Sequence, residues 1–169
     1  MGDLYSELLI KRKTPLIEQI AKIVMIVGTA ASVLLYLLTL QWVFLIVFIA
    51  LAVADYFLIP GFNLEYEYLY VNGELDIDKI MSKTKRKRVC SLNLTEKLEI
   101  MAPLSSHALD SYRNRKDMKV SDYSSGVENK AQFGLVMQDE RGKFMVIIEP
   151  DDVIINDIKR IAPRKVSTF

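Results

Sequence analysis

The chain opens with mixed polar and apolar positions and then contains a long stretch without charge. From residue 23 to residue 54 there is no Asp, Glu, Lys or Arg. As one helix rising about 1.5 Å per residue, this stretch would reach roughly 48 Å, which exceeds the ~30 Å hydrocarbon core of a bilayer. Two shorter helices fit that thickness better. The pattern therefore predicts a transmembrane helical hairpin over residues 20–60.

The position of the turn follows from the residues at the middle of the stretch. Gln41 is its only amide side chain and Trp42 its only indole, a pair typical of a membrane–water interface. The two helices are predicted at about residues 20–38 and 42–59. The Pro-Gly pair at 60–61 ends the second helix, because proline cannot continue the backbone ladder and glycine permits a turn. One long, tilted span is the alternative that the pattern leaves open.

Residues 1–19 precede the hairpin and combine apolar with charged positions. Leu4, Leu8, Ile17 and Ile20 recur at a roughly helical spacing. We therefore expect a cytoplasmic or interfacial amphipathic segment, part of it a helix along the membrane surface.

Basic residues before the first span predict the orientation of the hairpin. Such residues stay on the cytoplasmic side of a membrane, and two spans return the chain to that side. We therefore expect an integral, multi-pass protein of the plasma membrane with both termini in the cytoplasm. The residues just after the second span are acidic rather than basic, so they provide little evidence about the orientation. The basic residues are Lys11, Arg12, Lys13 and Lys22.

From residue 62 onward, short apolar runs alternate with turn residues, which is typical of an antiparallel β domain. Asn72-Gly73 is the strongest short hairpin signal, and it joins a tyrosine-rich strand at 64–71 to a strand at 74–80. In a third strand, at 86–94, alternation points Cys90, Leu92 and Leu94 inward and Val89, Ser91 and Asn93 outward. Further strands are expected at 98–101, 119–123, 133–138 and 143–149, and a final helix from Asp151-Asp152 to Pro163.

About seven antiparallel strands followed by one amphipathic helix is the order of elements in a pleckstrin-homology (PH) barrel with a C-terminal capping helix. Several blocks of the sequence resemble an uncharacterised family of bacterial membrane proteins in which a helical hairpin precedes a bacterial PH-like domain. The resemblance implies an α+β membrane protein with a cytoplasmic PH-like domain over 62–163 and a basic tail over 164–169, and it implies no established activity. The blocks are 65–68, 72–80, 86–88, 112–114, Tyr123-Ser124-Ser125-Gly126, Glu149-Pro150 and 162–165.

Residue types that enzymes and metal sites need are scarce. His107 is the only histidine and Cys90 the only cysteine, so neither a zinc cluster nor a cysteine–histidine pair has enough members. We expect a non-enzymatic protein without a catalytic, cofactor-binding or metal-binding site. A single cysteine also excludes an internal disulfide, in agreement with a cytoplasmic domain. The net charge of +1 argues against a nucleic-acid partner.

A run of basic residues is the strongest candidate for a binding site. PH-like domains of other families bind anionic lipid headgroups from strand–loop–strand positions like this one, and each cation near an anionic leaflet gains about 1 kcal/mol. The alternative is a solvated edge that deters strand pairing. The run comprises Lys83, Lys85, Arg86, Lys87 and Arg88.

Together these features predict a membrane-anchored PH-like module that docks a protein, peptide or anionic lipid at the cytoplasmic membrane face. The alternative is a structural or accessory subunit of a membrane complex. Such a subunit would assemble through the hairpin and barrel, either as a homo-oligomer or with a membrane-protein partner.

Overall fold

The computed structural model describes residues 5–115, 117–128, 130–140 and 142–167. The first four residues of the N-terminal segment and the last two of the predicted basic tail lie outside the described residues. The chain divides into two compact units. We call residues 13–64 and 81–85 the hairpin unit and the remainder the sheet unit.

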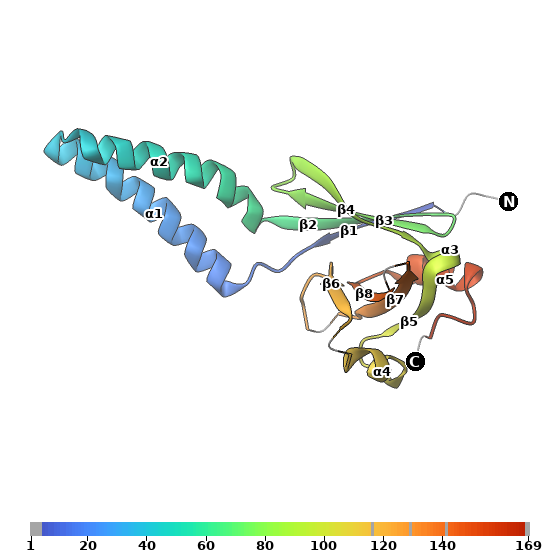
Figure 1. Ribbon diagram of the computed structural model, residues 1–169. Coiled ribbons are helices and arrows are strands. Elements are labelled where there is room, and N and C mark those ends of the chain that lie inside the picture. The colour runs from blue at the N-terminus through green and yellow to red at the C-terminus, as the bar shows by residue number, and fades with distance from the viewer. Residues whose placement is uncertain (1–4, 116, 129, 141, 168–169) are drawn as a thin grey trace. The chain divides into compact units, whose positions relative to one another are not determined.

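The hairpin unit contains two antiparallel helices, α1 (Leu16–Thr39) and α2 (Trp42–Leu58), followed by the short η1 (Ile59–Phe62) (Figure 1). The turn between the helices lies at the predicted place. Leu40 has a left-handed backbone (φ 53°) there, and its N–H donates to the Tyr36 carbonyl. By length and composition both helices can cross a membrane, and almost none of their surface is buried. They are therefore unlike core helices of a soluble domain and agree with membrane association.

One polar contact joins the two helices of the hairpin, and another joins the segments at its two ends. Thr29 Oγ1 donates to Asp55 Oδ2 over 2.7 Å, and Thr14 Oγ1 donates to the Phe62 carbonyl over 3.1 Å. Ser32 is the one buried residue of α1, and its hydroxyl donates to the Thr29 carbonyl. A hydroxyl of α1 and a carboxylate of α2 thus form a polar contact between the two helices.

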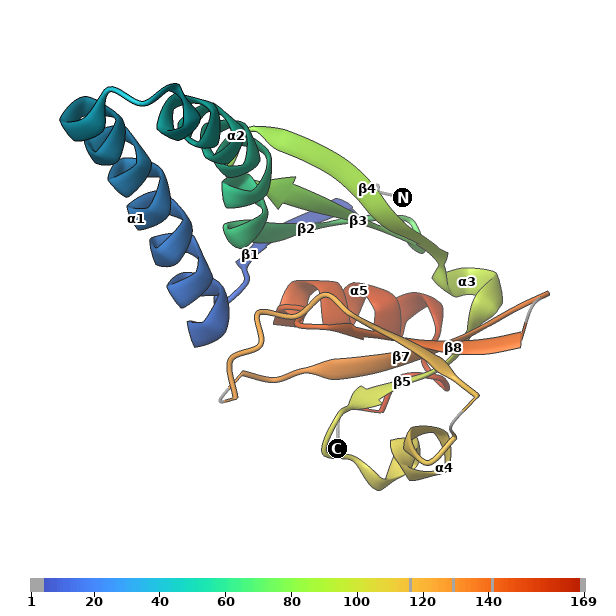
Figure 2. The ribbon, with the colours of Figure 1, turned by 60° about the vertical axis from the view of Figure 1, so that its left-hand side comes forward.

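The sheet unit is built on two four-stranded sheets, with strand orders β1-β2-β3-β4 and β5-β7-β8-β6 (Figure 2). The first sheet contains β1 (Tyr5–Lys11), β2 (Leu64–Val71), β3 (Glu74–Met81) and β4 (Lys85–Asn93). The second contains β5 (Leu98–Pro103), β6 (Lys119–Asp122), β7 (Phe133–Asp139) and β8 (Gly142–Ile148). The helices are α3 (Leu94–Lys97), η2 (His107–Leu109), α4 (Asp110–Arg113) and α5 (Asp152–Ile161).

The first strand corrects the prediction of an amphipathic helix before the hairpin. Residues 5–11 form β1, which pairs antiparallel with β2 from Tyr5 opposite Val71 to Lys11 opposite Glu65. The burial pattern has the period of a strand, because Ser6 and Ile10 are buried while the residues between them are exposed or half-buried. The helical hairpin is therefore inserted between the first two strands of the domain, and the predicted boundary at residue 62 omits β1.

Other elements agree with the sequence-based expectations. Asn72 (φ 47°) and Gly73 (φ 97°) form the turn between β2 and β3, and the positive φ values are those that such a tight turn needs. The α+β class is confirmed. The closed barrel is not confirmed, because no ladder joins the two sheets among the described strands. The purely antiparallel order is wrong, since β6 pairs parallel with β8.

The core lies between the sheets and α5. It contains Tyr68, Leu75 and Ile77 from the first sheet, and Ile154 and Ile158 from α5. The helix begins as predicted, because Asp151 Oδ1 accepts a hydrogen bond from the Ile154 N–H. After α5, the C-terminal segment of the chain runs along β5.

The C-terminal segment closes the outer edge of β5. The Met101 N–H donates to the Lys165 carbonyl over 2.7 Å, and the Ser167 N–H donates to the Met101 carbonyl over 2.8 Å. Val166 is buried by this parallel bridge. The predicted basic tail thus begins with residues that add to the second sheet.

Candidate functional site

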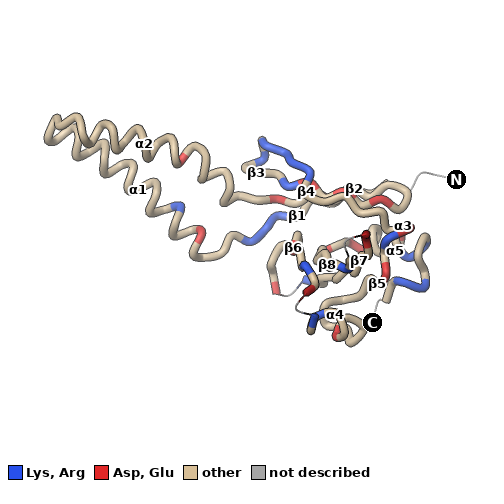
Figure 3. The backbone as a smooth tube through the Cα atoms, in the orientation of Figure 1, with Lys and Arg blue, Asp and Glu red and all other residues tan. Residues whose placement is uncertain are grey.

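The basic run begins in the turn between β3 and β4. Ser82 and Lys83 have left-handed backbones there (φ 47° and 60°). Lys and Arg residues are concentrated around this turn (Figure 3). The Ser82 N–H donates to the Asn63 carbonyl over 2.9 Å, and its hydroxyl donates to the Pro60 carbonyl over 3.4 Å. These partners immediately follow α2, so the turn is fixed within the hairpin unit where the chain leaves the second helix.

Three of the five basic side chains, those of Lys85, Arg86 and Arg88, contact aromatic or acidic residues. Lys85 Nζ lies 5.6 Å from the centre of the Tyr56 ring, a cation–π contact. Arg86 pairs with Glu67 at 2.7 Å. Among the described residues, the side chains of Lys83 and Lys87 have no ion-pair partner.

Arg88 and Arg86 cover acids on the outer face of the first sheet. Arg88 pairs with Asp76 at 2.7 Å and with Asp78 at 3.1 Å. Glu67 and Asp78 are buried although they lie on the face away from the core. Burial raises the pKa of Glu67 even though Arg86 opposes this shift. The two arginines therefore stabilise the sheet's own carboxylates, a role that the sequence did not reveal.

The strand β4 changes face after its arginines. Val89 and Cys90 both pack against the core, and Leu92 lies within it, whereas Arg88 bonds to acids of the outer face. Regular alternation would place Arg88 and Leu92 on one face, so the alternation is interrupted between them. The predicted outward position of Val89 is wrong for this reason, while the inward positions of Cys90 and Leu92 are confirmed. Leu94 is also buried, but it begins α3.

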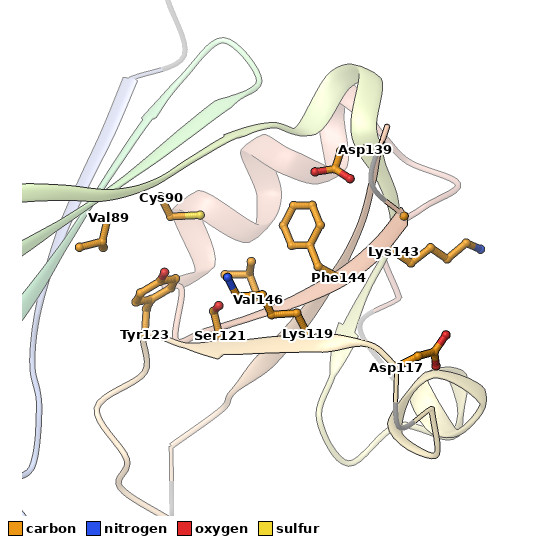
Figure 4. Close-up of a pocket in the computed structure, with 11 residues that line it drawn as sticks. Val89, Cys90, Asp117, Lys119, Ser121, Tyr123, Asp139, Lys143, Phe144 and Val146 are labelled. Atoms are coloured by element: carbon orange, nitrogen blue, oxygen red, sulfur yellow. The ribbon is translucent and has the colours of Figure 1, made fainter.

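A cleft of about 360 Å³ lies in the sheet unit between β4 and the β6–β8 edge (Figure 4). Phe144 and Val146 from β8 contribute apolar side chains, and two acids and two lysines are distributed around the cleft. No sequence pattern predicted this cleft. Its lining is Val89, Cys90, Asp117, Lys119, Ser121, Tyr123, Asp139, Gly142, Lys143, Phe144 and Val146.

The charges around the cleft are partly neutralised. Lys143 Nζ binds Glu99 Oε1 at 2.5 Å, and the Tyr112 hydroxyl donates to the same oxygen over 2.9 Å. The hydrogen bond from Lys143 lowers the pKa of Glu99. Burial raises the pKa of the Cys90 thiol, which keeps it protonated and a weak nucleophile. Cys90 is therefore not an activated thiol at this cleft.

A buried network holds one end of the cleft. The Ser125 hydroxyl and N–H both donate to Glu149 Oε2, and Lys130 pairs with Glu149 Oε1 at 2.7 Å. The Tyr68 hydroxyl donates to the Tyr123 carbonyl over 2.7 Å. Burial raises the pKa of Glu149, but the bonds from Lys130 and Ser125 outweigh it, so the net pKa is lowered. The sequence blocks at 123–126 and 149–150 thus meet in space and fix the segment that follows β6.

The fold is that of an α+β protein with two apolar helices that are consistent with membrane association and with a cleft in its sheet unit. A family model described as a bacterial PH-like domain (DUF6106) matches residues 2–168. The chain belongs to this bacterial PH-like family, as its sequence blocks indicated. Domains of this kind are generally binding modules without catalytic activity. No curated protein and no solved structure matches the chain.

Proposed function

We propose that this protein is a membrane-tethered binding module that docks a partner protein at the cytoplasmic membrane face, while its basic turn contacts anionic lipid headgroups. The register of β1 and β2 supports the tether. Lys11 lies opposite Glu65, so the two ends of the inserted hairpin leave from neighbouring positions on one sheet. Both ends must then lie on one side of the membrane, and the number of crossings is even.

Short connections hold the domain near the membrane surface in this topology. Four residues separate β1 from α1, and one residue separates η1 from β2. An extended chain spans at most about 3.3–3.6 Å per residue. The basic residues before α1 support a cytoplasmic position for the domain.

Cysteine labelling tests this topology in the full chain. In a Cys90→Ser background, Thr39→Cys places a thiol beside the turn of the hairpin and Lys97→Cys places one on an exposed site of the sheet unit. We expect a membrane-impermeant maleimide to label the first variant in intact cells and the second only after lysis. Labelling of Lys97→Cys in intact cells would overturn the proposed side of the domain.

The lipid contact rests on the position of the basic turn. Hydrogen bonds from Ser82 fix this turn to Pro60 and Asn63, directly after α2. Because Arg86 and Arg88 bind acids of the sheet, Lys83 and Lys87 remain for headgroups. At about 1 kcal/mol per cation, these two lysines supply about 2 kcal/mol, or roughly 30-fold in affinity.

Retention of lipids measures this contribution. The full chain is placed in nanodiscs of mixed phosphatidylglycerol and phosphatidylcholine, and native mass spectrometry counts the lipids that stay bound. Lys83→Gln/Lys87→Gln should remove the preference for phosphatidylglycerol. The matched control Lys97→Gln/Lys159→Gln alters two exposed lysines elsewhere and should keep it. Equal preference in both double variants would exclude the lipid contact.

Oligomeric state separates this proposal from the structural-subunit alternative. Crosslinking in native membranes should leave the module without a stoichiometric homo-oligomer. A stable homo-oligomer that persists when the lysines are neutralised would favour the structural subunit instead.

A further inference from the structure

The two edges of the second sheet are closed differently. At one edge, the C-terminal segment hydrogen-bonds to Met101 of β5. At the opposite edge, β6 pairs with β8 and with no other strand in the part of the chain that the structure describes. The outer side of β6 has no ladder partner among the described residues, and the cleft opens beside it, across from the edge strand β4 (Figure 4).

The exposed peptide groups of β6 can be identified from one hydrogen bond. The Tyr123 N–H, directly after β6, donates to the Ile147 carbonyl of β8 over 2.9 Å. Since successive peptide groups of a strand point to opposite sides, those of Lys119 and Ser121 also face β8. The N–H and carbonyl groups of Val120 and Asp122 then face outward. This pattern is a template for one more strand, which is a recurring mode of peptide recognition.

The side chains beside this edge favour a polypeptide over an anion. Phe144 and Val146 form an apolar floor that can receive an apolar side chain. Elsewhere around the cleft, Asp117 and Lys119 have opposite charges and no ion-pair partner among the described residues. A headgroup or free phosphate would meet the Asp117 carboxylate, whereas a peptide with a basic and an acidic residue complements both charges.

The size of the site fits a short segment. The four residues of β6 extend over about 13 Å at roughly 3.3 Å per residue. A cleft of about 360 Å³ is at the lower end of the range for ligand sites. It accommodates a few residues rather than a folded domain.

We propose that this cleft docks an extended segment of a partner protein. The segment adds as a strand to β6 through the peptide groups of Val120 and Asp122, and it lays one apolar side chain over Phe144 and Val146. This inference rests on the proposed function, because it names the partner chemistry of the binding module. It requires no participation of the basic turn.

A peptide selection with two cleft variants tests the proposal. Random linear heptapeptides displayed on phage are selected on the full chain in nanodiscs, after removal of phage that bind empty nanodiscs. Val120→Pro deletes the outward N–H without touching the β8 ladder, and proline is tolerated at such edge positions. Val120→Ala is the matched control, since Val120 is about half exposed (52%) and the alanine keeps the N–H.

We expect the selected peptides to bind wild type and Val120→Ala alike and to lose about tenfold in affinity on Val120→Pro. In the wild-type complex, the amides of Val120 and Asp122 should exchange their hydrogens more slowly. A second variant, Ser121→Phe, fills the cleft and should abolish binding even if the proline variant proves unstable in pulse proteolysis.

Three outcomes would overturn the proposal: no peptide enriched over empty nanodiscs, binding unaffected by Val120→Pro and Ser121→Phe, or protection confined to another surface. None of these outcomes alters the labelling of Thr39→Cys and Lys97→Cys or the lipid preference. The experiments therefore distinguish a failure of the peptide-docking proposal from a failure of the proposed membrane-tethered module.

Discussion

The strand β1 should stabilise a domain whose other strands all follow the hairpin, and two adjacent residues test this. Ile10 is 5% exposed and belongs to the main core, whereas its neighbour Leu9 is 54% exposed on the opposite face. Truncation of a buried isoleucine to alanine costs about 2–5 kcal/mol, from lost transfer free energy and the cavity left behind. An exposed leucine changes stability by about 0.5 kcal/mol or less. Ile10→Ala should therefore unfold the domain far more readily than Leu9→Ala.

Pulse proteolysis in urea on the detergent-solubilised full chain measures the difference. With a denaturant slope of about 1–3 kcal/mol per molar, a loss of about 3 kcal/mol lowers the midpoint by roughly 1–3 M urea. The cleavage products should come from the sheet unit, where β1 lies. Leu9→Ala serves as the control, because it removes an aliphatic side chain of the same size class from the same strand.

Equal midpoints for the two variants, or a larger shift for Leu9→Ala, would refute the register of β1 on β2. A surface-bound helix at residues 5–11 would leave the stability of the domain unchanged in both variants. Ser6→Ala is a third variant that tests the position of β1. The Ser6 hydroxyl donates to the buried Asp157 of α5 over 2.9 Å. Loss of a hydrogen bond to a charged group costs about 1.5–3 kcal/mol.

The same urea titration checks the remaining predictions. Glu149→Gln removes the buried partner of Lys130 and should lower the free energy of unfolding by about 1–3 kcal/mol at neutral pH. Because the folded pKa of Glu149 lies below its ordinary value of 4.5, the stabilisation is present above that value and is lost as the pH falls through the folded pKa. Wild type and Glu149→Gln should thus converge in acid, and a constant difference would contradict this linkage. Gly73→Ala should cost more than about 1 kcal/mol, because Gly73 has φ 97° and a Cβ there would collide with the Thr95 side chain. Gly61→Ala has open space and should change little; a similar loss in both would exclude strain at the turn.

Local signals were sufficient for much of the fold. The Asn72-Gly73 turn and the uncharged stretch each depend on residues close in sequence, and both predictions are confirmed as elements of the structure. β1 was missed because its partner β2 lies beyond the hairpin, so no short-range pattern connects them. Its exposed leucine, Leu9, also weakens the alternation that would indicate a half-buried strand.

For the candidate surfaces, too, the local sequence pattern was predicted and the long-range contacts were not. The sequence located the basic run, but not the acids that bind Arg86 and Arg88, because Glu67 lies on β2 and Asp78 on β3. The cleft could not be predicted, since its walls come from β4, β6 and β8. The parallel pairing of β6 with β8, which brings Ser121 opposite Val146, joins strands that are not consecutive in the chain.

The order of β1, hairpin and β2 also has a consequence for biosynthesis. The ribosome releases β1 first, yet its ladder partner appears only after both apolar helices have been made. If one helix failed to insert, the two strands would emerge on opposite sides of the bilayer and could not pair. In the proposed two-span topology, pairing of β1 with β2 therefore excludes chains in which only one of the two helices has inserted.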